Sequence, residues 1–215
     1  MNEKLVSVRA EIDTLTKRLV ARLKDRSEFP LNPQIYKAGA VSIEGNKRVS
    51  LLEFTLESME QHYVRVRRFE QPHQYPLIVE GNRGPMPIKD DLIKFYMRAM
   101  YRLCKVGIDS NFRETANCDA DLISMMNQRV HLGIHVAELK IKSNPEILKL
   151  DSYKEIEDML RNKKREVEVM EHARREAIKN EVSYNVVKPI FGWLIKKTVA
   201  IEVAYIKQIQ EKHLN

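Results

Sequence analysis

Apolar residues recur every three or four positions in the first part of the chain, at Leu5, Val8, Ile12, Leu15, Leu19 and Leu23. This spacing repeats one face of an α-helix, so it predicts a long amphipathic helix that ends near Glu28, before Pro30. Similar patterns predict further helices at about 50–70, 90–106, 119–142 and 153–179, and a last helix from Pro189 onward. Ser50 suits the N-cap of the second helix, and a proline suits the first turn of the last one.

Between the second and third predicted helices lies a segment, residues 71–89, that holds four of the eight prolines. Loops of this length are often functional. The chain shows no internal repeat, no low-complexity segment and no strand-like alternation long enough to build a sheet. We therefore expect an all-α fold, in which residues 1–215 form a single domain with a bundle of about six helices.

The composition is that of a globular protein with a basic surface. Hydrophobic residues make up 43% of 215 residues, which is enough for a sizeable core. Basic residues exceed acidic ones by 37 to 30, and a net charge of +7 favours an anionic partner. The charges are interleaved, however, most clearly in RNKKREVEVMEHARRE (161–176). This interleaving indicates solvated helix faces, so we do not expect a nucleic-acid partner.

Other features of the sequence exclude several classes of protein. Cys104 and Cys118 form no CxxC pair and no signal peptide precedes them, which predicts a reduced, cytoplasmic protein. No apolar run approaches the roughly 18 residues that a membrane span needs, so no membrane partner is expected. His131 and His135 have a metal-like spacing but no obvious third ligand. Without a Gly-rich phosphate loop or a GxSxG elbow, we expect neither a metal nor a cofactor.

The segment QRVHLGIHVAELK (128–140) has a cation near each end and a glycine between them. Arg129 and Lys140 are eleven residues apart, so on a helix they project from one face, about 20° out of phase. Gly133 costs a helix about 1 kcal/mol relative to alanine, so something needs its missing side chain. Either another helix packs closely against Gly133, or a ligand lies against the backbone between the two cations.

Polar residues also occur on helix faces that should be buried. Thr198 and Glu202 are four apart on the apolar stripe of the last helix. Glu202 either reaches water at the edge of that stripe or is buried with a partner. In the second case, desolvation raises its pKa and makes it a hydrogen-bond donor. Asn162 and Glu166 are likewise four apart, in line with the apolar face of the helix predicted at 153–179.

The order of these polar residues resembles that of the all-helical chorismate mutases, especially their longer single-chain branch. RVHLGIHVAELK (129–140) resembles the central helix of that family, and TVAIEVAYI (198–206) its C-terminal segment. SVRAEIDTLTKRLVARLKDRSEF (7–29) is similar to its first helix, and VRVRRFEQP (64–72) to the turn after its second long helix. The similarity extends from about Leu5 to Lys207.

The resemblance implies a chorismate mutase, an isomerase that converts chorismate to prephenate in phenylalanine and tyrosine biosynthesis. This intramolecular rearrangement requires no nucleophile, only a folded substrate conformer and stabilisation of charge on the breaking ether oxygen. The resemblance implies that Arg129 grips a carboxylate, while Lys140 and a protonated Glu202 flank the ether oxygen. The alternative is a non-catalytic basic helical module that binds nucleic acid or a partner protein.

Five further residues match substrate-binding positions of the family: Arg9, Asn162, Arg165, Glu166 and Thr198. Arg9 matches a cationic contact, and Arg165 an extra arginine of the shorter family members. The resemblance implies that Asn162 and Glu166 hold the substrate hydroxyl, a match that assumes a short deletion relative to the longer branch. Thr198 and Glu202 together match the last polar pair of the family, two residues four positions apart near its C-terminus.

The resemblance also implies a homodimer regulated by aromatic amino acids at its interface. Arg67 and Arg68 match the arginine pair that binds the effector. The family has small residues at the partner positions, where this chain has Arg113, Glu114 and Asn117. We therefore expect a homodimer with weak or absent allosteric regulation.

Overall fold

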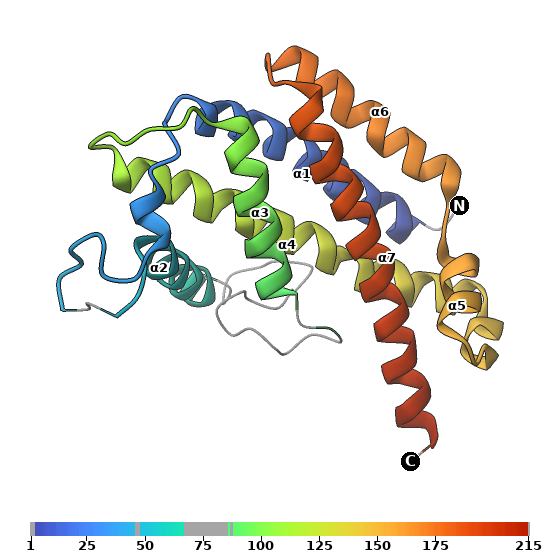
Figure 1. Cartoon of the computed structure of the whole chain (residues 1–215). Helices are drawn as coiled ribbons and strands as arrows, with labels where there is room; N and C mark the ends of the chain where they lie inside the picture. Colours follow the sequence, from blue (N-terminus) through green and yellow to red (C-terminus); the bar gives the residue numbers. More distant parts are fainter. Residues whose placement is uncertain (1–2, 46–47, 67–85, 87, 215) are drawn as a thin grey trace.

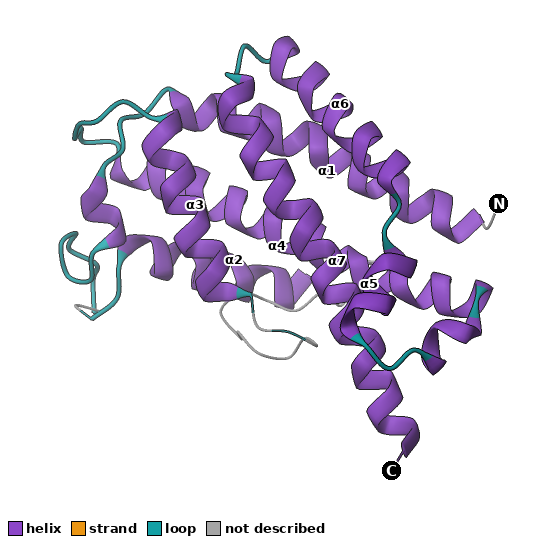
Figure 2. Cartoon of the chain, turned by 45° about the vertical axis from the view of Figure 1, so that its right-hand side comes forward, coloured by secondary structure: helices purple, strands orange, loops and turns teal. Residues whose placement is uncertain are grey.

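The computed structural model describes residues 3–45, 48–66, 86 and 88–214, and in this part of the chain it contains helices and loops but no strand (Figures 1 and 2). The α-helices are α1 (Glu3–Ser27), α2 (Leu51–Val66), α3 (Lys89–Leu103), α4 (Phe112–Ser143), α5 (Tyr153–Leu160), α6 (Lys163–Lys179) and α7 (Tyr184–Leu214). Two short 3-10 helices, η1 (Pro33–Tyr36) and η3 (Pro145–Lys149), lie between them. The predicted all-α fold is confirmed.

Four long helices form the body of the molecule. α4 packs along both α1 and α7, and α6 packs against the same two helices. α2 and α3 cover the first half of α4, while α5 packs on the C-terminal half of α7, which extends beyond the bundle in Figure 1. One large apolar core fills the bundle, and a smaller cluster around Ile156, Leu160 and Ile206 attaches α5 to α7.

The first predicted helix is confirmed with its apolar face. Val8, Ile12, Leu15, Leu19 and Leu23 are all buried in the core, as the spacing of three and four requires. The helix ends at Ser27, where the chain turns before Pro30. No helix in the described part of the chain is both long and apolar enough to span a lipid bilayer.

The predicted bounds of two later helices are wrong at their starts. α4 begins at Phe112 and not near residue 119, because its first turns bury Thr115, Ala116 and Cys118, which are too small or too polar to mark an apolar stripe. α7 begins at Tyr184, so Pro189 lies inside the helix and not in its first turn. The hydrogen bond that proline forgoes would reach the carbonyl of Asn185, an exposed residue that water can satisfy.

The single helix predicted over 153–179 is in fact two helices. α5 ends at Leu160 with Arg161 in an extended conformation, and the side chain of Asn162 then caps α6 by accepting the backbone N–H of Arg165 at 3.0 Å. The break lets α5 bury its apolar face on α7, while α6 turns Val169 toward the main core. The described residues therefore form seven α-helices where we predicted about six.

A buried polar network joins α1, η1, α3 and α4 at one end of the bundle. The guanidinium of Arg26 donates to Asp119 at 2.5 Å, and the hydroxyls of Tyr36 and Tyr96 donate to the same carboxylate at 2.5 and 2.6 Å. The remaining donors of Arg26 reach the carbonyls of Phe29, Pro30 and Leu31 and the hydroxyl of Tyr36. These contacts close the loop after α1 onto α4.

Candidate active site

A pocket opens between α1, α4, α6 and α7, at the end where α5 joins the bundle. Its walls are largely apolar, from side chains such as Ile12, Val136, Leu160, Val169, Ile195 and Val199. The eight residues predicted as catalytic or substrate-binding all line this one pocket: Arg9, Arg129, Lys140, Asn162, Arg165, Glu166, Thr198 and Glu202. Four separate helices and one helix junction therefore contribute polar groups to a single apolar-walled cavity.

Arg129 is a buried cation that forms no close ion pair with the described residues, although the charge of Asp13 acts on it. Its side chain comes from the middle of α4, is only 2% exposed and lies over the ring of Phe191, 5.9 Å from the ring centroid. Its Nε has no hydrogen-bond partner, and no carboxylate of the described residues forms an ion pair with it. Burial lowers the pKa of Arg129 to about 10, so the group remains charged at neutral pH. Arg9, half-buried on α1, also lacks an ion pair with any described carboxylate.

Lys140 and Glu202 form a close pair across α4 and α7. The Nζ of Lys140 donates to Glu202 Oε2 at 2.7 Å and to the carbonyl of Leu160 at 2.7 Å. Glu202 is 4% exposed, so it is buried with a partner and does not reach water at the edge of the helix. Burial raises the pKa of Glu202 to about 7, although Lys140 opposes this shift. Glu202 can therefore carry a proton near neutral pH.

Gly133 serves helix packing and does not line the pocket. A Cβ at this position would lie 2.9 Å from Cγ2 of Thr198, 3.0 Å from its carbonyl oxygen and 3.1 Å from Cγ2 of Ile201. The missing side chain thus lets α4 and α7 approach closely, which settles the choice between a helix neighbour and a ligand. Val136, one turn further on, supplies the pocket wall on this face. Thr198 lines the pocket while its hydroxyl donates to its own helix at Leu194.

Asn162 and Glu166 reach the pocket because a helix starts there. Asn162 is the N-cap of α6, and Glu166 lies one turn into that helix. The carboxylate of Glu166 accepts two hydrogen bonds from Arg161, one from Nε at 3.0 Å and one from Nη2 at 2.8 Å. Sequence patterns gave no signal for Arg161, because it stands outside both helices and pairs with a residue five positions away.

Arg165 is a cation whose charge is already partly neutralised. Its guanidinium donates to Asp13 at 2.7 Å and to Glu168 at 3.3 Å. Asp13 also lies 3.6 Å from His172 on α6. Neither Asp13 nor His172 stood out in the sequence, because a charged residue at the margin of an amphipathic helix is common on any solvated face.

Comparison with known proteins connects this geometry to a family. The family model described as "Chorismate mutase type II" matches residues 111–203, a span that contains Arg129, Lys140, Glu166 and Glu202. A chorismate mutase of Trichoderma parareesei is 24% identical over 246 aligned residues, which cover 95% of this chain and 92% of that protein. The chain is thus similar to chorismate mutases over most of its length.

Solved chorismate mutase structures share the fold. The Candida albicans chorismate mutase Aro7p, in complex with L-Trp, superposes with a TM-score of 0.78 at 22% identity, over 94% of this chain and 90% of that one. AtCM1 with tyrosine bound in an allosteric site superposes with a TM-score of 0.77 at 22% identity, over 94% of both chains. The long all-helical chorismate mutase fold is therefore common to the three chains.

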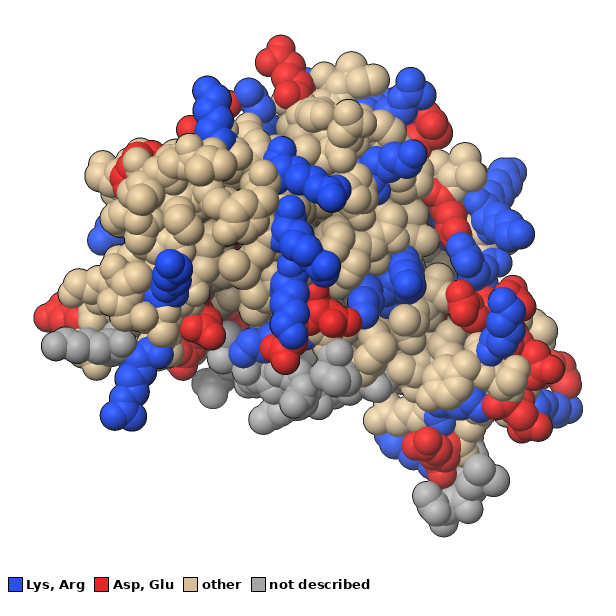
Figure 3. All heavy atoms as spheres, in the orientation of Figure 1, with Lys and Arg blue, Asp and Glu red and all other residues tan. Residues whose placement is uncertain are grey.

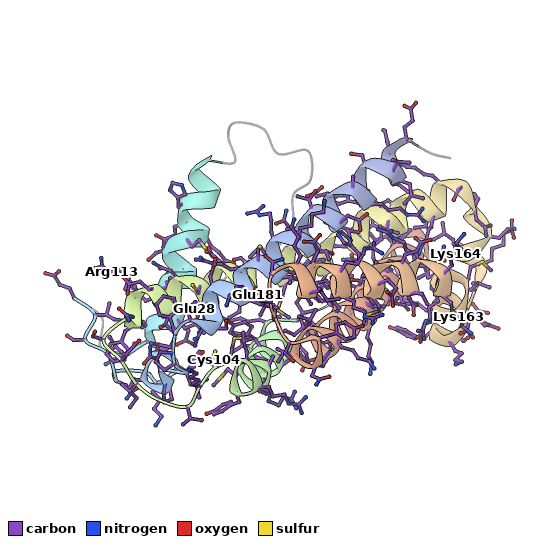
Figure 4. The ribbon with its side chains drawn as sticks, turned by 90° about the horizontal axis from the view of Figure 1, so that it is seen from above. Glu28, Cys104, Arg113, Lys163, Lys164 and Glu181 are labelled. Atoms are coloured by element: carbon purple, nitrogen blue, oxygen red, sulfur yellow. The ribbon has the colours of Figure 1, made fainter. Side chains whose placement is uncertain are left out.

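Of the predicted effector positions, those that the structure describes do not line the pocket. Arg67 and Arg68 are outside the described residues. Arg113, Glu114 and Asn117 are in the first turns of α4, and Figure 4 shows Arg113 far from Lys163 and Lys164 at the start of α6. Within the described chain, no group of three or more His, Cys, Asp or Glu residues is arranged to hold a metal ion.

Proposed function

We propose that this protein converts chorismate to prephenate in the pocket between α1, α4, α6 and α7. The observation that carries this proposal is the pair of guanidinium groups, Arg9 and Arg129, that face an apolar pocket without an ion pair to any described carboxylate. A buried charge left open in this way costs several kcal/mol unless an anion completes it. Chorismate is a dianion, so its two carboxylates supply one partner for each arginine.

The two arginines fix the conformation of the substrate as well as its place. An arginine can grip a carboxylate with two parallel hydrogen bonds, which fixes direction and distance together. Arg9 projects from α1 and Arg129 from α4, so a dianion held by both is folded between two rigid helices. Confining a flexible substrate to a compact conformer speeds its rearrangement, although no chemical group of the protein enters the reaction.

Lys140 and Glu202 stabilise the ether oxygen as its bond to carbon breaks. An ammonium group has three donors, and those of Lys140 that reach Glu202 and Leu160 leave a third for the substrate. A protonated Glu202 adds a second donor from α7. Both donors are fixed before the reaction begins and lie in a water-poor site. Removing one donor of this kind typically lowers the reaction rate by a factor of about 10² to 10³.

Glu166 and Asn162 complete the site at the start of α6. Glu166 is ionised and only accepts hydrogen bonds, so it can accept the one that the substrate hydroxyl donates. The side-chain oxygen of Asn162 is occupied by the N–H of Arg165, which leaves its amide N–H group for an acceptor. Thr198 and Arg165 also line this pocket.

We further propose that residues 1–215 form one domain that acts as a cytoplasmic homodimer. The two cysteines are free and buried, which suits a reducing compartment. Because Arg113, Glu114 and Asn117 replace small residues, aromatic amino acids should change the activity little. Sedimentation at micromolar concentration tests the dimer, and a single monomeric species would contradict it.

The alternative of a nucleic-acid-binding module has less support. On the face drawn in Figure 3, Lys and Arg side chains stand singly or in short groups among acidic and uncharged residues. The decisive experiment is to add the pure protein to chorismate and follow the loss of chorismate absorbance and the formation of prephenate. Turnover far above the uncatalysed rate is expected, and Arg129→Met should abolish most of it. A rate equal to that of the uncatalysed reaction would overturn the proposal.

A further inference from the structure

The junction between α5 and α6 is anchored to the pocket from both sides. The last carbonyl of α5, at Leu160, accepts a hydrogen bond from Lys140 at 2.7 Å. The next residue, Arg161, is extended at φ −66° and ψ 131°, and its own N–H bonds back to Glu157 at 2.9 Å. From this position the side chain of Arg161 reaches the first turns of α6.

There the guanidinium of Arg161 meets the carboxylate of Glu166 with two hydrogen bonds, at 3.0 and 2.8 Å, one to each oxygen. A two-point contact of this kind fixes both the position and the plane of a carboxylate. Arg161 does not itself line the pocket, whereas Glu166 does. Among the described residues, the only other ion pair of Arg161 is a longer one with Glu157, at 3.7 Å.

We propose that Arg161 is a positioning residue, which orients the Glu166 carboxylate as the hydrogen-bond acceptor for a hydroxyl donor of the substrate. This inference rests on the proposed function, since it assigns a partner to a residue of the same site. Each oxygen of Glu166 keeps a lone pair after binding Arg161 and donates nothing. The ligand must therefore provide the proton of that hydrogen bond, and a substrate analogue whose hydroxyl is methylated should bind poorly.

The charge state of Glu166 agrees with this geometry. Its pKa lies below the usual value, first because of the hydrogen bonds from Arg161, while partial burial acts in the opposite direction. The other charged groups around this carboxylate are Lys163 and Arg165 on the same helix, and Arg9, Lys140 and Glu202, which line the same pocket from α1, α4 and α7. Without Arg161, the carboxyl should take up a proton at a higher pH and lose its fixed orientation.

A double-mutant cycle separates positioning from simple attraction of an anion. Arg161→Met should lower kcat/KM about tenfold in the parent chain and less than about twofold when Glu166→Gln is already present. Arg161→Lys should recover part of the loss, because a lysine supplies the charge but not the two-point contact. Arg174→Met is the matched control, since Arg174 is an exposed arginine on α6 paired only loosely with Glu171, at 3.8 Å. It should leave kcat/KM unchanged.

The pH dependence and a direct titration complete the test. The acidic limb of kcat/KM should move to higher pH in Arg161→Met and stay in place in Arg174→Met. Carbon-13 NMR of labelled glutamate, with Glu166 assigned through Glu166→Gln, should show the same displacement without any turnover. An equal loss in both backgrounds, or an unchanged Glu166 titration in Arg161→Met, would overturn the inference. If the parent protein does not turn over chorismate, the proposed function fails, and the NMR titration still decides the role of Arg161.

Discussion

Two buried arginines, Arg26 and Arg129, occupy similar places in the helical bundle and have opposite surroundings. Arg26 is 0% exposed, and its donors reach Asp119, Tyr36 and three backbone carbonyls. Arg129 is 2% exposed, yet its Nε has no partner and no described carboxylate forms an ion pair with it. In Figure 4 the Arg26 region lies near the labelled Cys104, whose thiol donates to the backbone carbonyl of Arg26, and Lys163 and Lys164 mark the start of α6 at the other end of the view.

The difference separates a charge that stabilises the fold from a charge that, as we propose, binds a substrate carboxylate. A buried cation that is completely hydrogen-bonded ties the elements around it together, and removing it leaves its partner unpaired. A buried cation with open donors gives the fold nothing comparable, since its desolvation is not repaid within the chain. The same residue type therefore predicts a loss of stability at one site and a loss of activity at the other.

The largest expected effect is that of Arg26→Met on stability. The substitution leaves Asp119 as an uncompensated buried charge, and breaking a buried pair in this way costs about 3–5 kcal/mol. Urea denaturation followed by circular dichroism measures the change in the free energy of unfolding. Arg174→Met, at an exposed position, should change it by less than about 0.5 kcal/mol. Equal stabilities of the two variants would show that the network is not structural.

Arg129→Met should have the opposite effect to Arg26→Met: a loss of activity without a loss of stability. Loss of one anchoring guanidinium should lower kcat/KM by a factor of about 10² to 10³. The free energy of unfolding should stay the same or rise, because methionine fills a similar volume without an unpaired buried charge. Chorismate turnover and urea denaturation on the same preparation test both halves. A variant that is destabilised as strongly as Arg26→Met would place Arg129 with the structural charges.

Gly133 and Gly192 offer a smaller, sharper contrast between a packed helix face and an open one. Gly133→Ala should cost about 1–3 kcal/mol, because its Cβ would meet Thr198 at 2.9 Å and force α4 and α7 apart. Gly192→Ala should stabilise the protein by up to about 1 kcal/mol, since nothing lies within 4 Å of the added carbon and alanine favours the helix. Thermal unfolding of both variants decides the signs. Stabilisation by Gly133→Ala would contradict the close packing.

Much of this fold could be predicted from the sequence, because apolar spacing reports directly on which helix face is buried. α1 followed that rule, whereas the start of α4 did not, since Thr115 and Ala116 carry no hydrophobic signal. The break at Arg161 was missed because α5 and α6 have apolar faces in nearly continuous register. A cap such as Asn162 marks the start of a helix only when the preceding helix is known to have ended.

The site divides in the same way. Arg129, Lys140 and Glu202 stood out because a charge or carboxylate on an apolar helix face is unusual, and a helical period predicts which of these side chains share a face. Contacts that depend on loop geometry or on two separate helices gave no such signal. The contact between Arg161 and Glu166 depends on the loop between α5 and α6. The contact between Asp13 and Arg165 joins two separate helices. Both became visible only in the three-dimensional structure.

Glu202→Gln tests the remaining difference between the two regions, the protonation of a buried carboxyl. Burial raises the pKa of Glu202 to about 7, so the donor is present below that pH and is lost above it. The kcat/KM of the parent reports on the free enzyme and should fall about tenfold per pH unit above the pKa. Glutamine donates at any pH, so the variant should lose this alkaline limb and differ from the parent only about twofold at pH 7. Glu171→Gln, an exposed control on α6, should keep the parent profile. If Glu202→Gln retained the alkaline limb, the titrating group would lie elsewhere, and Glu202 would be a structural partner of Lys140, as Asp119 is of Arg26.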